Sequence, residues 1–172
     1  MRTATAAVGS AGFFVAAPGV VAGLVPWWLT GWQMRDWPVL SILLRLVGTA
    51  LVAAGAAVLV AAFVRFVREG AGTPAPVAPP EHLVVGGLYR YVRNPMYLAI
   101  VSIIAGQALV FGQSVLLLYA LAVFAIMVGF VRWYEEPILA RRFGAGYHAY
   151  RQAVPAWRPR LRPWHPGAHP DR

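Results

Sequence analysis

Four long apolar runs leave this chain few ways to fold. A helix needs about 20 mostly apolar residues to cross the hydrocarbon core of a bilayer, with a lower limit of about 17. The first two runs meet this length, and the third meets it only if Tyr91 and Val92 extend it on its N-terminal side. The runs cover residues 11–30, 39–64, 97–111 and 114–131. They predict an all-α, polytopic membrane protein with about four transmembrane helices.

The residues within and between the runs add further expectations. Pro18 and Pro26 are expected to kink or end the first helix, which we interpret as retained rather than cleaved as a signal peptide. Gly112 and Gln113 form a tight polar break between the third and fourth runs, so these two helices are predicted to be antiparallel neighbours. The proline-rich segment 69–81 favours an extended, semi-rigid path.

The composition agrees with a membrane protein. Of the 172 residues, 59% are hydrophobic and 12% are charged, whereas an average soluble domain has about 25% charged residues. Cysteine is absent, which excludes a disulfide framework, a thiolate metal site and a cysteine nucleophile. The spacing of the four histidines suggests no metal site.

The charge is strongly basic, with 15 arginines against 6 acidic residues and a net charge of +9. The first loop holds only Arg35, which Asp36 offsets, whereas four arginines lie in 65–93 and eight in 132–172. Because positive residues stay inside, both termini and the central loop are predicted to be cytoplasmic, in a bacterial inner membrane. The arginines form no continuous soluble face, which disfavours nucleic acid and indicates membrane lipids as partners. Arg45, inside the second run, is expected to snorkel to the interface.

The first polar cluster, GLYRYVRNPMY at residues 87–97, stands immediately before the third apolar run. If a helix continues through it, Tyr89, Arg93 and Tyr97 lie at i, i+4 and i+8 on one face. That face would offer one fixed cation and two phenol hydroxyls at the cytoplasmic boundary. The alternative is a snorkelling arginine among interfacial tyrosines.

The second polar cluster follows the fourth run and contains Arg132, Glu135, Glu136 and Pro137. Consecutive side chains on a helix point about 100° apart, so the two carboxylates cannot flank one bond as a hydrolase pair does. We expect one to face inward while the other meets water or Arg132. An inward carboxylate could hold a ligand ammonium or a ribose diol, and the alternative is an ordinary helix-end salt bridge.

The C-terminal part is predicted to lie at the membrane surface. Residues 138–151 alternate apolar and basic side chains, which is typical of an interfacial helix. Residues 144–149 match the loose dinucleotide pattern G-x-G-x-x-A, but no strand precedes them, so a dinucleotide site is disfavoured. Residues 163–172 are expected to be frayed.

Taken in order, these motifs resemble the isoprenylcysteine carboxyl methyltransferase family and its phospholipid methyltransferase relatives. The matching segments are residues 72–76, 83–97, 135–137, 143–144, 147–150 and 154–155. The resemblance implies a helical membrane enzyme that uses S-adenosylmethionine in a pocket formed by the last two spans and their cytoplasmic segments. It also implies an N-terminal two-helix membrane segment, 1–68, and a methyltransferase-like core, 69–172.

The resemblance implies a set of cofactor-binding residues and leaves the catalytic residue unassigned. The set comprises Tyr89, Arg93, Asn94, Tyr97, Glu135 and Glu136. Arg93 suits the cofactor carboxylate through two parallel hydrogen bonds, and a glutamate suits its ammonium or ribose. Asn94 stands where the eukaryotic carboxyl methyltransferases have histidine. Asparagine does not titrate near neutrality, which argues against a proton-acceptor role there and against a prenylated-protein carboxylate as substrate.

The expected activity is methyl transfer to a lipophilic substrate that enters laterally from the bilayer. Carboxyl, amine, thiol and phenol groups all remain open as the acceptor. One alternative is an NADPH-dependent enzyme resembling membrane sterol reductases, in which Arg141 and Arg142 would meet the 2′-phosphate. A second alternative is a non-enzymatic membrane protein whose polar clusters only set its topology.

Overall fold

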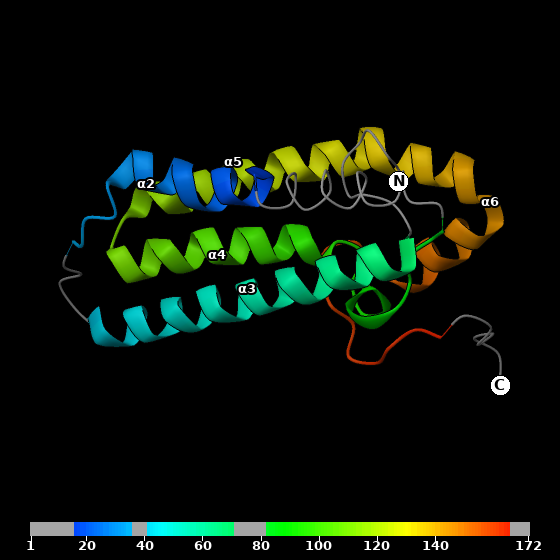
Figure 1. The fold of residues 1–172 in the computed structure, drawn as a ribbon, viewed down its shortest axis with the longest axis horizontal. Coiled ribbons are helices and arrows are strands. Elements are labelled where there is room, and N and C mark those ends of the chain that lie inside the picture. Colours follow the sequence, from blue (N-terminus) through cyan, green and yellow to red (C-terminus); the bar gives the residue numbers. More distant parts are fainter. Residues whose placement is uncertain (1–15, 36–40, 71–81, 166–172) are drawn as a thin grey trace, which may run out of the picture.

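The computed structural model describes residues 16–35, 41–70 and 82–165 (Figure 1). These residues form helices and loops without any strand, which confirms the all-α prediction. The elements in chain order are η1 (Val20–Leu24), α2 (Val25–Thr30), α3 (Ser41–Gly70), η2 (Gly87–Arg90), α4 (Pro95–Phe111), α5 (Ser114–Phe130), η3 (Val131–Glu135) and α6 (Glu136–Ala153). Of the segment 69–81, expected to be extended, residues 69 and 70 belong to α3 and 71–81 lie outside the described residues, as do residues 166–172 of the end expected to fray.

Two helical segments are long and apolar enough to cross a membrane, Ile42–Glu69 and Ser114–Ala153. Two shorter apolar helices, Ala16–Thr30 and Pro95–Phe111, accompany them. All four overlap the apolar runs of the sequence, and Ser114–Ala153 continues as a helix beyond residue 131, where its run ends. The count of about four membrane spans stays a prediction, because the shorter helices fall below the usual spanning length.

Helices α3 and α4 approach each other closely because glycine lies at their crossing. A Cβ atom added to Gly48 would stand 2.6 Å from the carbonyl oxygen of Gly106, and one added to Gly106 would stand 2.7 Å from that of Gly48. Small residues at such crossings let backbones pack directly, which is the main source of helix association in lipid.

Helix α4 ends at Gly112, whose φ of 69° is left-handed and favours glycine. The chain reverses there and α5 packs back along α4 (Figure 1), which confirms the predicted antiparallel pair. Their shared core is apolar and buried, and it contains Ile104, Ala108, Leu116, Ala120 and Val123.

The first helix continues through Pro26 instead of ending there. The N–H of Val25 bonds to the carbonyl of Val20, which makes a π turn just before the proline. Proline has no N–H to offer the preceding turn, and two side chains donate there instead. Tyr119 donates to the carbonyl of Val21 at 2.9 Å, and the Gln107 amide to that of Ala22 at 2.6 Å.

The predicted extension of the third run is wrong. Helix α4 begins at Pro95, and Tyr91 and Val92 lie in the turn that precedes it. Proline suits a first helical position because the N–H it lacks would be unpaired there. Tyr89, Arg93 and Tyr97 therefore do not share one helix face, since Tyr89 belongs to the short helix η2.

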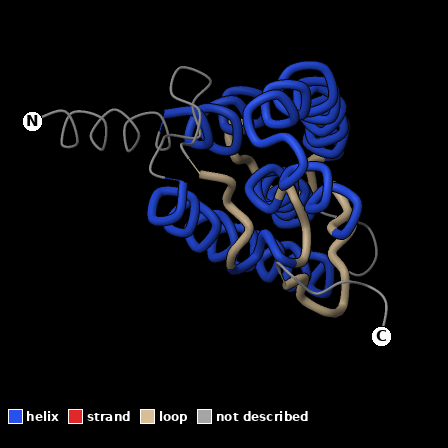
Figure 2. Tube along the Cα trace, turned by 90° about the vertical axis from the view of Figure 1, so that its right-hand side faces the viewer, coloured by secondary structure: helices blue, strands red, loops and turns tan. Residues whose placement is uncertain are grey.

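The two ends of the bundle differ in chemistry. The end of α3, the loop before α4, helix α6 and the segment after it all gather at one end (Figure 1). A view along the long axis shows the helices end-on as a bundle, with the loops of this end in front (Figure 2). Most of the arginines belong to these segments, so this end is the basic one.

Candidate functional site

The site lies at the basic end, where three segments far apart in the chain meet. The loop before α4 supplies Arg93, the π turn η3 leads into Glu136, and α6 supplies Tyr147 and Arg151. The bonds that join them span 43 and 54 residues of sequence, so the site depends on tertiary structure.

An arginine–glutamate pair forms the centre of the site. The Nη1 atom of Arg93 donates to Oε1 of Glu136 at 2.7 Å and to the hydroxyl oxygen of Tyr147 at 3.1 Å. The other oxygen of Glu136 lies 3.3 Å from Nη2 of Arg151. The side chains of Arg93 and Glu136 are only 12% and 11% exposed. A carboxylate this enclosed needs such partners to remain charged.

Both adjacent carboxylates face inward, so the expectation that only one would do so is wrong. Glu135 accepts a hydrogen bond from the Tyr97 hydroxyl at 3.1 Å, while Glu136 pairs with arginine. The reason is Pro137, which lacks an N–H and so interrupts the α-helical bonding pattern. The N–H of Glu136 bonds instead to the carbonyl of Val131, five residues back. Consecutive side chains in this wider π turn are closer in direction than in an α-helix.

Tyr89 is nearly enclosed, with 6% of its surface exposed. Its ring packs near Phe66, and its carbonyl accepts a bond from the Tyr150 hydroxyl at 2.7 Å. Burial raises the pKa of Tyr89 above its ordinary value, with smaller contributions from Tyr150 and from the carboxylates of Glu135 and Glu69. The phenol therefore stays protonated at physiological pH and is available as a donor.

Two buried donors of the site have no hydrogen-bond partner within the described part of the chain. They are the hydroxyl of Tyr89 and the Nε atom of Arg93. Buried polar groups are normally satisfied, because leaving one unpaired costs about 1–3 kcal/mol. Acceptor oxygens of a ligand, such as those of a carboxylate or of hydroxyls, are the groups that would satisfy these two donors.

Asn94 joins two segments of the chain at the edge of the site, and its expected role toward the cofactor stays a prediction. Its amide donates to the carbonyl of Ala156 at 3.2 Å, and the N–H of Arg93 donates to that of Pro155 at 3.0 Å. These bonds hold the segment after α6 against the start of α4. Trp157 then packs near Tyr97, with ring centroids 6.4 Å apart.

The sequence missed two residues of this site, Arg151 and Trp157. Arg151 reaches Glu136 because α6 bends at Gly144, where φ is 49° and ψ is −126°. Trp157 reaches the membrane helices, with its ring 5.2 Å from that of Phe124 in an edge-on contact. Gly144 was the only local sequence signal that could have indicated Arg151, and no local signal indicated Trp157.

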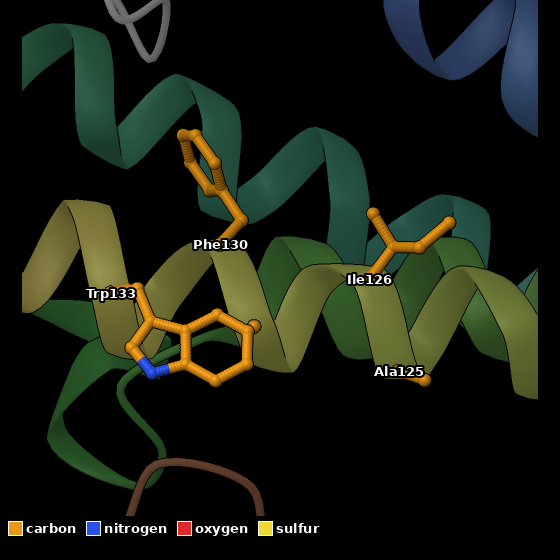
Figure 3. Close-up of a pocket in the computed structure, with 5 residues that line it drawn as sticks. Ala125, Ile126, Phe130 and Trp133 are labelled. Atoms are coloured by element: carbon orange, nitrogen blue, oxygen red, sulfur yellow. The ribbon is translucent and has the colours of Figure 1, made fainter.

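An open apolar groove runs along the outer side of α5, next to the site in sequence. Figure 3 shows the indole of Trp133 lying along this helix. The indole can lie there because residue 129 is glycine, since a Cβ atom at that position would stand 2.9 Å from the ring. The other lining residues are Ala125, Ile126 and Phe130. The groove offers no charged group, so it suits an apolar chain and not a polar cofactor.

The family of the chain follows from a comparison with known protein families. The family model for phospholipid methyltransferases matches residues 43–146, more than half of the chain. The chain belongs to the phospholipid methyltransferase family. It is therefore a methyltransferase of membranes, as the apolar helices also indicate. The match contains all six predicted cofactor-binding residues, whereas Tyr147, Arg151 and Trp157 lie beyond it.

Searches of curated proteins and of solved structures return no significant match. Within the phospholipid methyltransferase family, the isoprenylcysteine branch therefore stays a prediction.

Proposed function

We propose that this protein transfers the methyl group of S-adenosylmethionine to a lipophilic acceptor that reaches the site from the bilayer. S-adenosylmethionine supplies an electrophilic methyl group carried on a sulfonium. The protein must bind the cofactor, align the acceptor with the methyl and keep water away. Alignment of this kind is the main contribution a protein makes to such a displacement.

The observation that carries the proposal is the unpaired edge of Arg93. Its Nη1 atom is occupied by Glu136 and Tyr147, while Nε is buried without a partner. A guanidinium with one edge anchored and another edge free is oriented to receive a carboxylate. The methionine carboxylate of the cofactor has that chemistry.

Glu135 complements Arg93 at the same site. Among the described residues, Glu136 forms ion pairs with both Arg93 and Arg151. Glu135 instead accepts a hydrogen bond from the hydroxyl of Tyr97. We therefore assign Glu135 to the ammonium or ribose hydroxyls of the cofactor. The free hydroxyl of Tyr89 would donate to a further oxygen of the same ligand.

The acceptor is proposed to approach along the membrane helices. Two apolar surfaces suit an acyl or prenyl chain. One is the groove beside Trp133, and the other is formed by Trp157 and Phe124. Asn94 donates its side-chain N–H to Ala156, and because an amide does not titrate near neutrality, we assign it no proton-acceptor role.

The same proposal includes location and topology. The arginines at the basic end favour the cytoplasmic side, so both termini would be cytoplasmic in a bacterial inner membrane. Residues 69–172 would form the methyltransferase core, and residues 1–68 an N-terminal membrane segment that packs against it.

Titration of the detergent-purified protein with S-adenosylhomocysteine, followed by thermal shift, tests the proposal. A ligand that binds only the folded state stabilises it by about 2.7 kcal/mol at 100 times its dissociation constant. We expect this stabilisation with S-adenosylhomocysteine and not with NADPH. Stabilisation by NADPH alone would replace the proposal with a reductase, and no response to either ligand would favour a non-enzymatic protein.

The test variant is Arg93→Lys, which keeps the charge beside Glu136 but loses the fork that binds a carboxylate at two points. We expect the affinity for S-adenosylhomocysteine to fall at least about tenfold, the worth of one charged hydrogen bond. Arg132→Lys, an exposed position on η3, is the matched control and should bind as the wild type does. Equal affinities in both variants would remove Arg93 from the site.

A further inference from the structure

The five residues Arg158 to Arg162 form an exposed basic turn after α6, here termed the 158–162 turn. Leu161, the fourth of the five, is 99% exposed, although it is apolar. Arg158 and Arg162, at the two ends of the turn, are exposed as well. A single exposed leucine is ordinary by itself, and its meaning depends on the fixed backbone and the charges around it.

The fold itself imposes this exposure, because the 158–162 turn is fixed on both sides of Leu161. The N–H of Arg160 donates to the carbonyl of Tyr91 at 2.9 Å, and the N–H of Trp164 donates to that of Arg90 at 3.0 Å. The Arg90 side chain returns a bond from Nε to the carbonyl of Trp164 at 2.7 Å. Leu161 lies between these points and cannot turn inward without breaking them.

The contacts of the turn also set its depth relative to the membrane helices. Just before it, Trp157 packs edge-on against Phe124, which lies six residues, or about 9 Å, before the end of α5. At its middle residue, Arg160, the turn is bonded to Tyr91, four residues before α4 begins at Pro95. The chain thus passes beside the apolar helices and emerges where their apolar runs end, and we assign this level to the lipid headgroups.

The charge of the region fits an anionic surface. Residues 137–165 contain no aspartate or glutamate, and they include six arginines: Arg141, Arg142, Arg151, Arg158, Arg160 and Arg162. Guanidinium groups bind phosphates through paired hydrogen bonds. Basic residues at an anionic leaflet strengthen membrane attachment, about fivefold for each arginine.

We propose that the 158–162 turn is a lipid-binding surface specific for anionic phospholipids. Leu161 enters the acyl region, and Arg158 and Arg162 hold the phosphates on either side of it. Apolar insertion and charge together give stable attachment where either one alone gives little. This surface is separate from methyl transfer, and its existence does not depend on the cofactor.

The absence of native cysteine allows a direct test with the whole protein. Leu161→Cys, labelled with an environment-sensitive fluorophore, is placed in nanodiscs of phosphatidylcholine alone or mixed with phosphatidylglycerol. We expect blue-shifted emission and quenching by nitroxide-labelled acyl chains when phosphatidylglycerol is present. Water-like emission that iodide quenches equally in both nanodiscs would overturn the proposal.

Two charge variants in the labelled protein separate this turn from the general basic charge. Arg158→Gln with Arg162→Gln should lower the inserted fraction about fivefold for each arginine removed. Arg68→Gln with Arg132→Gln removes the same charge from exposed positions on α3 and η3 and should leave the signal unchanged. Equal losses in the two pairs would show that the headgroups are not held by the turn and would overturn the assignment.

Discussion

At the scale of single residues, Arg93 has two roles that removal of its side chain would not separate. It neutralises the buried Glu136, and it carries the unpaired Nε that we propose for the cofactor carboxylate. Its replacement by alanine would leave a buried carboxylate with Arg151 as the remaining cation. Loss of binding in that variant would therefore mix loss of contact with loss of folding.

The two adjacent glutamates are expected to respond differently to the same isosteric change. Glu136→Gln removes the negative charge that pairs with Arg93 and should lower the free energy of unfolding by about 3 kcal/mol, because it leaves a buried cation without a counter-charge. Glu135→Gln should change stability by less than about 1 kcal/mol, since glutamine still accepts the bond from Tyr97. It should instead weaken S-adenosylhomocysteine binding about tenfold. Thermal unfolding and titration of both variants measure this, and a reversed order would contradict the assignment.

Tyr89→Phe removes a buried hydroxyl that has no described partner. We expect the free protein to be as stable as the wild type or up to about 1 kcal/mol more stable. If the hydroxyl meets the ligand, affinity for S-adenosylhomocysteine falls in the same variant. Because burial raises the pKa of Tyr89, this contribution to affinity should not change between neutral and mildly alkaline pH. Tyr134→Phe, at an exposed tyrosine of η3, is the control and should change neither quantity.

At the scale of elements, the crossing of α3 with α4 depends on the absence of side chains. Gly48→Ala would drive a methyl group into the backbone of Gly106, and overpacking of this kind costs about 1–3 kcal/mol. Gly23→Ala has nothing within 4 Å of the added carbon and should be nearly neutral. Unfolding of the two variants in detergent gives the comparison, and equal stability would mean that the helices separate easily at this crossing.

The first helix is held to the bundle by polar bonds that a proline makes necessary. Gln107 donates to the carbonyl of Ala22 and accepts from the indole N–H of Trp32 at 3.2 Å. Gln107→Leu should therefore cost about 1–2 kcal/mol, the range found for polar contacts between membrane helices. Gln152→Leu, at an exposed position of α6, is the control. A neutral Gln107→Leu would indicate that water or lipid satisfies the freed groups.

At the scale of the whole molecule, the segment after α6 closes the site by returning to the loop before α4. Truncation after Ala153 removes every bond from that segment to Arg90, Tyr91, Arg93 and Asn94. We expect helix content by circular dichroism to persist while S-adenosylhomocysteine binding is lost. Truncation after His165 keeps all these bonds and should preserve binding. Full binding by the shorter chain would show that the segment is dispensable.

The ordered part of this segment also corrects the sequence expectation. Residues 163–172 were expected to fray, yet Trp164 is bonded to Arg90 and packs 5.5 Å from the ring of Tyr150. The local composition of proline and arginine favours disorder. Contacts about 74 residues away in the chain outweigh it.

The sequence alone determined where the helices lie and which of their ends are polar. Both properties are local, because the length and hydropathy of a run decide whether it can enter a bilayer. Helices α3, α4 and α5 follow the apolar runs to within a few residues at most ends. The six proposed cofactor residues also came from local motifs, and their roles stay predictions.

Only the tertiary structure decided which partner each of those residues contacts. Glu135 meets Tyr97 while Glu136 meets Arg93, and this depends on a π turn that Pro137 induces. Asn94 holds the returning segment across 62 residues of sequence. Such pairings depend on two free-energy contributions: the cost of burying charged groups and the gain from hydrogen bonds to every buried polar atom. That balance exists only once the distant segments are packed together.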